Sequence, residues 1–464
     1  MVYDQSNRDT IAAIATPIGQ AGIGIIRLSG SLSGKMARTI FKPAKPVVSL
    51  QSHRLYLGNV VDPASGQVID EVLLSFMKGP FTYTREDVVE INSHSGYLLL
   101  QKILEIVLQL GARMAQPGEF TFRSFINGRL DLTQAEAIVD LINSKSERGL
   151  WIASQQIQGA FKEEIAKLRQ AALDLLAQVE LAIDFPDEEE GVFQAQKAED
   201  FIRETLIGPI EKLIAKRDQR KMWIDGIATV IVGRVNAGKS SLLNRLLNEE
   251  RALVTPIPGT TRDIIESTVH VGGLPLRIMD TAGFRKVKGK LERLGMEKTE
   301  KKMEEADLLL LVIDQSRALN QDDMDLLKKI RCKKALVVLN KRDLPVKTNV
   351  KSLSKPLDGH RVVSISALTG EGIEDLHLAI RDLILLGGGE DTTASIAPNL
   401  RHTLALSAAF ESFQKALQNL RTDSPVEIIA ADLTEGLGAL GEITGEQSSD
   451  ELLDTIFSRF CVGK

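Results

Sequence analysis

Hydrophobic residues change their spacing along this chain, and the changes divide it into three kinds of segment. Over residues 1–120 they form short runs separated by Gly, Pro and Asp, such as TIAAIATPIG, GIGIIRLSG and RLYLGNVVD, which is typical of strands. Residues 96–111 differ, because GYLLLQKILEIVLQLG has the spacing of an amphipathic helix. We therefore predict an N-terminal α+β domain over residues 1–120.

From residue 121 the hydrophobic residues recur with the 3.6-residue period of helices. LTQAEAIVDLINS, WIASQQIQGAFKEEIAKLRQAALDLLAQVELAIDF and AEDFIRETLIGPIEKLIAKR keep this period in the segment that ends at residue 222. The period returns beyond the glycines at 387–389, in LRHTLALSAAFESFQKALQNL, EIIAADLTEGLGALGEI and SSDELLDTIFSRF. The two flanks, residues 121–222 and 387–464, are predicted to form one helical domain.

The segment between the flanks, residues 223–386, alternates apolar strands with amphipathic helices, as a mostly parallel sheet requires. A domain can be inserted into another at a surface site when its own ends lie close together. The predicted fold is therefore multidomain, with an α+β domain, a helical domain built from two flanks, and an inserted α/β domain.

The composition favours folded domains that face water. Hydrophobic residues make up 43% and charged residues 26% of the chain, and the net charge of −5 gives no overall attraction to nucleic acid or anionic lipid. Any RNA contact is therefore expected to be local or shared with a partner. Two cysteines imply no disulfide framework, and neither a signal peptide nor a run of 18 apolar residues is found. We expect a cytoplasmic protein that does not enter a membrane.

A phosphate-binding loop follows the first apolar strand of the inserted domain. IATVIVG leads into GRVNAGKS at 233–240 and then into SLLNRLL, which matches G-x-x-x-x-G-K-[ST] between a strand and a helix. In such a loop, backbone N–H groups face the phosphates, Lys239 adds a positive charge and Ser240 offers its hydroxyl to Mg²⁺. The nucleotide contacts predicted here are Asn236, Ala237, Gly238, Lys239, Ser240 and Ser241.

Further nucleotide-binding elements follow in the order expected of a Ras-like GTPase. PGTTRD supplies Thr260 and Thr261 for Mg²⁺ and the γ-phosphate, and the strand LRIMD ends in Asp280. In ALVVLNKRD, the carboxylate of Asp343 can accept two hydrogen bonds from guanine, and adenine lacks this pair of donors. The remaining predicted contacts are Thr255, Pro256, Ile257, Pro258, Gly259, Thr281, Ala282, Gly283, Asn340, Lys341, Ser366 and Ala367. We predict that the nucleotide is GTP.

The sequence DTAGF at 280–284 lacks the glutamine that orients the attacking water in many GTPases. Phe284 follows the glycine, and its ring offers no hydrogen bond to water. A monovalent cation held by the amide oxygen of Asn236 would stabilise charge on the phosphates, and Glu292 in LERLGMEK would reach the water from the next segment. The alternative for Glu292 is a surface carboxylate in the first turn of a helix. The residues alone leave both roles open.

The motifs GTTRD, DTAGF and ERLG, together with the last four residues CVGK, resemble those of the MnmE (TrmE) family of tRNA modification GTPases. ATPIGQAGIGIIRLSG, PGEFTFRSFINGRLDLTQAEAI and the inserted domain extend the likeness over the whole chain. The resemblance implies addition of a carboxymethylaminomethyl group at C5 of the wobble uridine of certain tRNAs. It also implies a homodimer, a tetrahydrofolate one-carbon donor, and an FAD-dependent partner, MnmG (GidA), in a heterotetramer or larger complex.

The resemblance also assigns roles to single positions. G domains that dimerise across K⁺ are implied, with the ion held by Asn236, Thr255, the backbone of Ile257, and Thr260. The implied Mg²⁺ ligands are Ser240 and Thr261, and the implied catalytic glutamate is Glu292. In the N-terminal folate-binding and dimerisation domain and at the chain end, the implied folate contacts are Arg27, Glu90, Arg129 and Lys464. Some relatives have lysine in place of Arg129, whose guanidinium has a different reach and donor geometry. Cys461 is a candidate catalytic residue, because it lies near the folate site in the family.

Two other functions fit parts of the sequence. One is a regulatory Ras-like GTPase switch that binds RNA or ribosomes without modification chemistry, but the flanks show no RNA-binding module such as a basic KH-type domain. The other is a folate-binding scaffold with a vestigial GTPase, which the complete set of nucleotide motifs disfavours. For Arg27, Glu90 and Arg129, structural ion pairing is the alternative to ligand binding.

Overall fold

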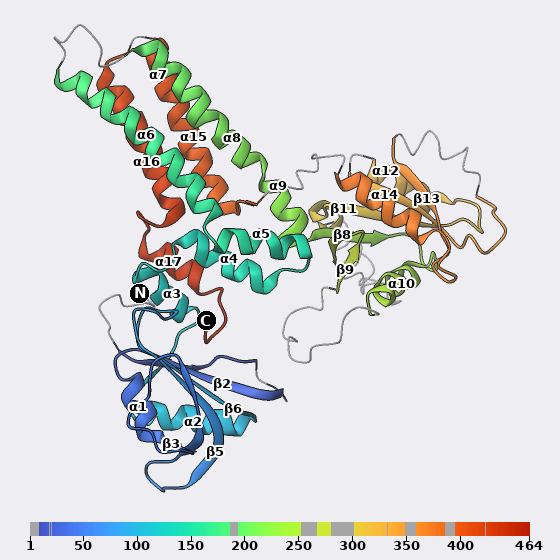
Figure 1. Cartoon of the computed structure of the whole chain (residues 1–464). Helices are drawn as coiled ribbons and strands as arrows, with labels where there is room; N and C mark the ends of the chain where they lie inside the picture. Colours follow the sequence, from blue (N-terminus) through green and yellow to red (C-terminus); the bar gives the residue numbers. More distant parts are fainter. Residues whose placement is uncertain are drawn as a thin grey trace.

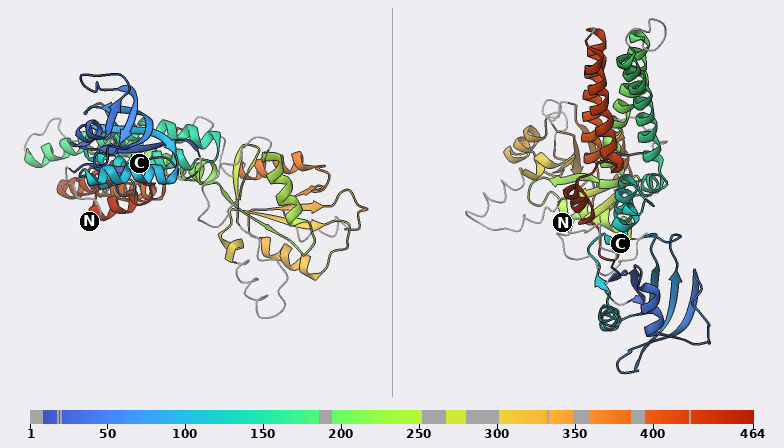
Figure 2. Two further views of the ribbon diagram at one scale, coloured as in Figure 1. Left: turned by 90° about the horizontal axis from the view of Figure 1, so that it is seen from below. Right: turned by 90° about the vertical axis from the view of Figure 1, so that its left-hand side faces the viewer.

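The computed structural model describes residues 9–17, 19, 21–185, 194–251, 267–279, 301–331, 333–348, 359–385, 395–422 and 424–464. An N-terminal sheet domain, a long helical domain and an α/β domain are arranged around one junction (Figure 1). The α/β domain extends to one side of the rest, and Figure 2 shows the same separation from below. The C-terminus lies where the helical domain meets the N-terminal domain (Figure 1).

The N-terminal domain is a seven-stranded sheet in the order β3-β4-β5-β6-β2-β1-β7. Its strands are β1 (Ile11–Ile14), β2 (Ala21–Ser29), β3 (Phe41–Pro43), β4 (Arg54–Val61), β5 (Val68–Met77), β6 (Val88–Ser95) and β7 (Arg113–Met114). Helices α1 (Ser33–Ile40) and α2 (Tyr97–Gln109) pack with alternate strand residues, such as Leu74 and Ile91, in one buried core. The side chains between these alternate residues face away from that core.

The helical domain is assembled from both flanks of the chain. Its first flank contains α3 (Glu119–Ile126), α4 (Leu132–Asn143), α5 (Glu147–Ile157), α6 (Ala160–Asp184), α7 (Ala195–Phe201), η1 (Ile202–Ile207), α8 (Gly208–Ala215), α9 (Arg217–Arg220) and η2 (Lys221–Asp225), where η marks a π-helical segment. The second flank contains α15 (Leu400–Arg421), α16 (Val426–Thr444) and α17 (Asp450–Phe457). Phe161, Leu175, Phe413 and Leu433 from both flanks share one core. Residues of both flanks therefore pack together in one core.

The helical period that we followed from residue 151 to 185 is interrupted in the structure. Gly159 has a φ of 102° and separates α5 from α6. A left-handed backbone suits glycine and ends a helix, whereas the apolar spacing continues through it. Periodicity alone therefore did not predict this break. Among the described residues, no helix is long and apolar enough to cross a membrane.

The α/β domain has a six-stranded sheet in the order β13-β12-β11-β8-β10-β9. Its elements are β8 (Ile227–Val232), α10 (Lys239–Arg251), β9 (Ser267–Val271), β10 (Leu274–Ile278), β11 (Leu308–Asp314), α12 (Gln321–Ile330), β12 (Ala335–Asn340), β13 (Arg361–Ser364) and α14 (Ile373–Leu385). All neighbouring strands are parallel except β9 and β10. The mostly parallel sheet is thus confirmed, and β8 lies between β10 and β11, which puts the loop after β8 at the centre of the sheet edge.

Candidate functional site

The loop after β8 has the backbone of a phosphate-binding loop. Gly233, Asn236 and Gly238 have φ angles of 150°, 66° and 97°. A Cβ added to Gly238 would lie 2.0 Å from Nδ2 of Asn340, so glycine alone fits this close approach. Asparagine tolerates a left-handed backbone better than most residues, which explains Asn236 in this turn. The residues predicted from the motif therefore form one tightly turned loop.

Lys239 begins helix α10 at the exit of this loop. Its Nζ lies 2.7 Å from the carbonyl oxygen of Gly233 and 2.7 Å from that of Arg234. The ammonium group is thereby held within the loop at a helix N-terminus, where the helix dipole also favours an anion. Burial lowers the pKa of Lys239. A positive group enclosed in this way fits the phosphates of a nucleotide, and Ser240, the predicted Mg²⁺ ligand, follows directly.

Asn340 joins the phosphate-binding loop to the predicted guanine-binding turn. Its Nδ2 donates to the carbonyl oxygen of Ala237 at 2.9 Å, and its Oδ1 accepts from the backbone N–H of Ala367 at 3.0 Å. The hydroxyl of Ser366 donates to Oδ1 of Asp343 at 2.6 Å and so orients that carboxylate. These predicted residues lie together at the carboxyl ends of β12 and β13. The arrangement suits recognition of the two guanine donors.

Asp314, at the end of β11, is a residue that sequence reasoning did not select. Its Oδ2 accepts from Nζ of Lys341 at 2.6 Å, and Lys341 has a φ of 68°. Burial would raise the pKa of Asp314, but hydrogen bonds from Lys341 and Ser316 outweigh it and lower the pKa. The signal was present in LLLLVID, an apolar strand that ends in a carboxylate beside the nucleotide strands.

Part of the predicted nucleotide site lies outside the described residues. This holds for Thr255, Pro256, Ile257, Pro258, Gly259, Thr260, Thr261, Asp280, Thr281, Ala282, Gly283 and Glu292. It also holds for Phe284. The roles of these residues in Mg²⁺ and K⁺ binding and in catalysis stay predictions.

A second polar site lies on the N-terminal sheet, at the face opposite α1 and α2. Arg27 of β2 and Glu90 of β6 are directly opposite each other, and their side chains pair at 2.8 Å between Nε and Oε1. Nη1 of Arg27 also donates to the carbonyl oxygen of Gly463 at 2.9 Å. The Arg27 and Glu90 side chains remain 24% and 25% exposed, so a ligand has access to both.

The last four residues of the chain are held against the N-terminal domain by their backbone. Gly463 has a φ of 93°, and an added Cβ would lie 2.8 Å from the carbonyl oxygen of Ile14. The N–H of Gly118 donates to the carbonyl oxygen of Cys461 at 3.3 Å, as does the N–H of Lys464. The tail therefore turns at Cys461, whose side chain is an exposed free thiol.

Two aromatic residues lie beside the arginines of this second site. The guanidinium carbon of Arg129 is 4.9 Å from the ring centre of Tyr83, and that of Arg27 is 5.8 Å from the ring centre of Phe120. Burial raises the pKa of Tyr83, although its hydrogen bond with Thr121 and the charges of both arginines oppose the shift. Sequence reasoning missed Tyr83 and Phe120, because nothing in the order of residues places them near Arg27.

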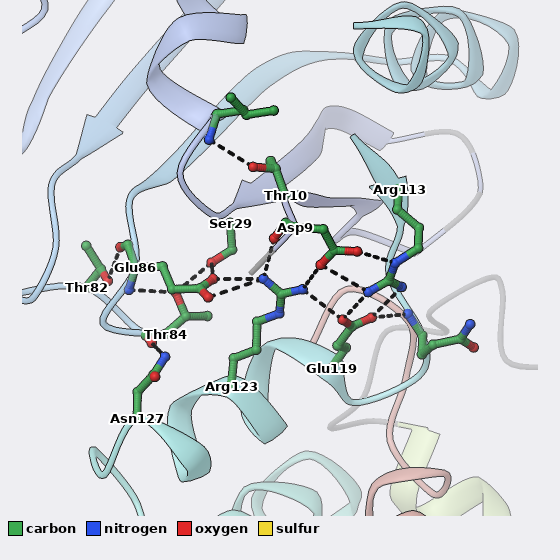
Figure 3. Close-up of polar contacts among 12 residues, drawn as sticks. Asp9, Thr10, Ser29, Thr82, Thr84, Glu86, Arg113, Glu119, Arg123 and Asn127 are labelled. Atoms are coloured by element: carbon green, nitrogen blue, oxygen red, sulfur yellow. Dashed lines mark hydrogen bonds and ion pairs between the residues drawn. The ribbon is translucent and has the colours of Figure 1, made fainter. Parts of the chain in front are cut away.

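A charge network fixes helix α3 on the N-terminal sheet (Figure 3). Arg123 pairs with Asp9 at 2.6 Å, with Glu119 at 3.0 Å and with Glu86 at 3.1 Å. Arg113 pairs with Asp9 at 2.6 Å and with Glu119 at 2.7 Å. The Arg123 and Glu119 side chains are buried, so this pairing satisfies charges that water cannot reach. Because α3 also carries Phe120, the network fixes the position of the aromatic ring beside Arg27 in the second site.

The phosphate-binding loop after the central strand and the predicted guanine-binding turns are the features of a Ras-like GTPase, joined here to a helical domain and an N-terminal sheet domain. A family model described as "MnmE helical domain" matches residues 132–461, and one described as "GTP-binding protein TrmE N-terminus" matches residues 10–129. The chain belongs to the MnmE family of tRNA modification GTPases. The resemblance found in the sequence motifs is confirmed.

Full-length relatives agree with the family models. The tRNA modification GTPase MnmE of Alkaliphilus oremlandii is 42% identical over 461 residues, which cover 98% of this chain and 99% of that protein. The protein of the same name from Geobacillus kaustophilus is 42% identical over 458 residues, with 98% and 99% covered. A solved structure of the G domain of the T. maritima FeoB iron transporter is 26% identical, with a TM-score of 0.26 over 34% of this chain and 98% of that one. The two proteins named tRNA modification GTPase MnmE confirm a GTPase of tRNA modification.

Proposed function

We propose that this protein hydrolyses GTP and, with an FAD-dependent partner of the MnmG (GidA) kind, adds a carboxymethylaminomethyl group at C5 of the wobble uridine of certain tRNAs. The relatives that match almost the whole chain are named tRNA modification GTPases, which supports tRNA as the substrate. The observation that carries the proposal is a second site, where Arg27 contacts both Glu90 and Gly463. A GTPase that acts only as a switch does not require a polar site formed by the N-terminal domain and the C-terminal tail.

The second site is proposed to bind a one-carbon derivative of tetrahydrofolate. Folates combine an aromatic ring system rich in N–H donors with a glutamate tail that carries carboxylates. Glu90 suits the ring donors, and Arg27, Arg129 and Lys464 suit the carboxylates. Tyr83 supplies an aromatic wall 4.9 Å from the guanidinium of Arg129. FAD is assigned to the partner, so this chain is expected to contact it only through the complex.

The proposed homodimer uses the exposed face of the N-terminal sheet. Leu57 of β4 and Leu73 of β5 are opposite each other and are 51% and 43% exposed, and Leu55 nearby is 65% exposed. Neighbouring aliphatic side chains on an open sheet face favour burial against a partner. Leu73 lies opposite Asn92, and two residues further along β5, Ser75 lies opposite Glu90. Residues two apart in a strand face the same side, so the exposed leucines share the sheet face of the proposed folate site. A second copy bound there would lie beside the ligand.

For the GTPase reaction, we propose that Ser240 and Thr261 hold Mg²⁺, and that Asn236, Thr255, Thr260 and the backbone of Ile257 hold K⁺ when two G domains meet. Bound Mg²⁺ and K⁺ would neutralise charge on the phosphates. Within the described loop, Asn236 is the third residue before Lys239, in the left-handed backbone of the same tight turn. Glu292 is proposed to orient the attacking water. Cys461 remains a candidate for the modification chemistry, which we place in the cytoplasm.

Nucleoside analysis of tRNA tests the proposed function. Cells that lack the protein are expected to lose the carboxymethylaminomethyl group at C5 of the wobble uridine, and the full chain is expected to restore it. A chain that ends at Phe460 should keep GTP hydrolysis and fail to restore the modification, because it lacks the tail that contacts Arg27. Normal wobble uridines in cells without the protein would refute the proposed function.

A further inference from the structure

Helix α4 is paired with α9 and α15, the helices of the helical domain that precede and follow the nucleotide domain along the chain. On α9, Arg220 donates two hydrogen bonds to Asp140 of α4, at 2.6 and 2.5 Å. On α15, Arg401 donates to both carboxylate oxygens of Glu136 of α4, at 3.1 and 2.6 Å. Paired bonds of this kind fix the direction of both partners. In Figure 1, α9 leads from the side of the helical domain into β8, with α4 and α5 beside it.

A buried histidine strengthens the second of these contacts. Nε2 of His402 lies 2.7 Å from Oε2 of Glu136, and its Nδ1 accepts the backbone N–H of Asn399 at 3.3 Å. Because Nδ1 accepts, the proton of the neutral ring is on Nε2. Burial lowers the pKa of His402, which keeps the ring neutral. The start of α15 is therefore held on α4 by an ion pair and by a neutral histidine.

The C-terminal end of α4 reaches the nucleotide domain itself. In the loop that follows α4, the carbonyl oxygen of Lys145 accepts from Nε2 of His270, and Nζ of Lys145 donates to Oγ1 of Thr268 at 3.3 Å. Both partners are in β9, which begins directly after the segment 252–266 that contains the predicted Mg²⁺ ligand Thr261. A displacement of β9 would therefore act on the end of α4.

The N-terminal end of α4 lies at the C-terminal tail. Leu132 and Ala135 of α4 are fully buried in one cluster with Phe457 and Phe460. Phe460 directly precedes Cys461, whose carbonyl oxygen accepts from Gly118. A helix of 12 residues is about 18 Å long. The contacts near its two ends therefore link β9 of the nucleotide domain to the cluster that precedes the tail.

We propose that α4 is the helix through which the nucleotide state reaches the C-terminal tail, with the Asp140–Arg220 pair as the positioning contact. Because Lys145 after α4 is bonded to β9, a movement of the nucleotide domain would act on α4, and the packing of α4 against Phe457 would pass that movement to the tail. Asp140 is a positioning residue that acts through α4. Coupling is reciprocal, so a ligand at the tail would change nucleotide affinity by the factor by which nucleotide changes tail affinity.

The exposed thiol of Cys461 offers a direct measurement at the tail. In a full-length Cys332→Ser variant, Cys461 is the remaining cysteine, and its reaction rate with an Ellman-type disulfide can be compared between GDP and a non-hydrolysable GTP analogue. The two rates are expected to differ about fivefold or more, which is the usual size of allosteric coupling. Asp140→Asn should bring the ratio close to one with nucleotide binding retained.

The matched control is Glu199→Gln. Glu199 also accepts from arginines, from Arg421 at 2.6 Å and from Arg203, and in the described part of the chain both partners lie in the bundle of the helical domain. This variant should keep the parent ratio. Arg220→Lys is the second test variant, because it keeps the charge and loses the paired geometry, so its ratio should fall between those of the parent and Asp140→Asn.

The inference would be overturned if the Cys461 thiol of the parent reacted at equal rates with either nucleotide bound. It would also be overturned if Asp140→Asn and Arg220→Lys kept the rate ratio of the parent. The thiol measurement needs no folate, so it separates this inference from the proposed function. Absent folate binding with an intact thiol ratio would reject the proposed ligand and leave the coupling in place. Tight folate binding with equal thiol reaction rates in GDP and in the GTP analogue would support the proposed ligand and reject the coupling.

Discussion

Arg27 donates to the carbonyl oxygen of Gly463 across 436 positions of sequence, at 2.9 Å. Gly463 can take this position because it lacks a Cβ, which would lie 2.8 Å from the backbone of Ile14. Gly463→Ala should therefore displace the tail and lower tRNA modification about tenfold, since the left-handed strain and the collision act together. GTP hydrolysis should remain at the parent rate. Nucleoside analysis and a phosphate-release assay check the two expectations.

Gly66→Ala is the matched control for the tail. Gly66 has a φ of 71° in the same domain, but no atom lies within 4 Å of its added Cβ. It tests the backbone strain without the collision, and modification should stay near the parent level. Parent-level modification by Gly463→Ala would contradict the role of the tail contact.

Asp343→Asn should change the base that the nucleotide site accepts. The Ser366 hydroxyl orients the Asp343 carboxylate at 2.6 Å, and the carboxylate can accept two donors of guanine. Asparagine presents a donor there, so GTP affinity should fall about a hundredfold or more, while xanthosine triphosphate, with a carbonyl in place of the amine, should gain affinity. Hydrolysis of both nucleotides provides the measurement.

A surface pair of the same domain supplies the control for this change of base. Asp382 accepts from Arg361 at 2.6 Å, and both side chains are 48% exposed. Asp382→Asn should leave the preference for GTP unchanged. If Asp343→Asn bound GTP as the parent does, guanine recognition by Asp343 would be refuted.

The nucleotide site and the second site differ in how much of each could be predicted from the sequence. Lys239, Asn340 and Asp343 could be predicted, because each belongs to a short motif at the end of an apolar strand, and parallel strands bring those ends together. Arg27 and Gly463 have no such local signal. Their contact depends on packing between distant segments, so only the family resemblance indicated a site at Arg27. Neither a local motif nor the family resemblance indicated Tyr83.

The network around Arg123 should make the N-terminal domain sensitive to acid. Burial would raise the pKa of Glu119, but hydrogen bonds from Arg113 and the Gln116 N–H, and the charges of both arginines, lower it below its ordinary value of 4.5. The pKa of Asp9 is likewise lowered from 3.8, because bonds from Arg113 and Arg123 outweigh burial. The unfolded chain therefore takes up protons that the folded chain excludes. The stabilisation is present above the ordinary pKa values and is lost as the pH falls below them.

Glu119→Gln should lower the free energy of unfolding by about 3 kcal/mol at pH 7, because it leaves the buried Arg123 and the partly exposed Arg113 short of a carboxylate. It should also flatten the dependence of stability on pH below 4.5, the ordinary value for this carboxyl. Amide hydrogen exchange of β1 across this pH range checks both expectations. An unchanged pH dependence in the variant would show that other carboxylates govern acid unfolding.

Potassium should stimulate GTP hydrolysis more than sodium does. Asn236 lies in the left-handed turn of the phosphate-binding loop, and an amide oxygen there would contribute to an oxygen cage for the larger ion. The rate in KCl is expected to exceed that in NaCl about tenfold or more, because the bound ion would neutralise charge that develops on the phosphates. Asn236→Ala should remove the difference and keep GDP binding. Equal rates of the parent in both salts would rule out the cation hypothesis.

Glu292 lies outside the described residues, and its proposed role can be separated from binding by kinetics. Glu292→Ala should bind GTP with parent affinity and lose turnover about a hundredfold, because positioning of the attacking water acts on the transition state and leaves the ground state unchanged. Asp325→Ala removes a 52% exposed carboxylate from the same domain and should leave kcat unchanged. Single-turnover hydrolysis with both variants distinguishes the two carboxylates. A parent-like kcat for Glu292→Ala would return Glu292 to the surface role that its sequence context also allows.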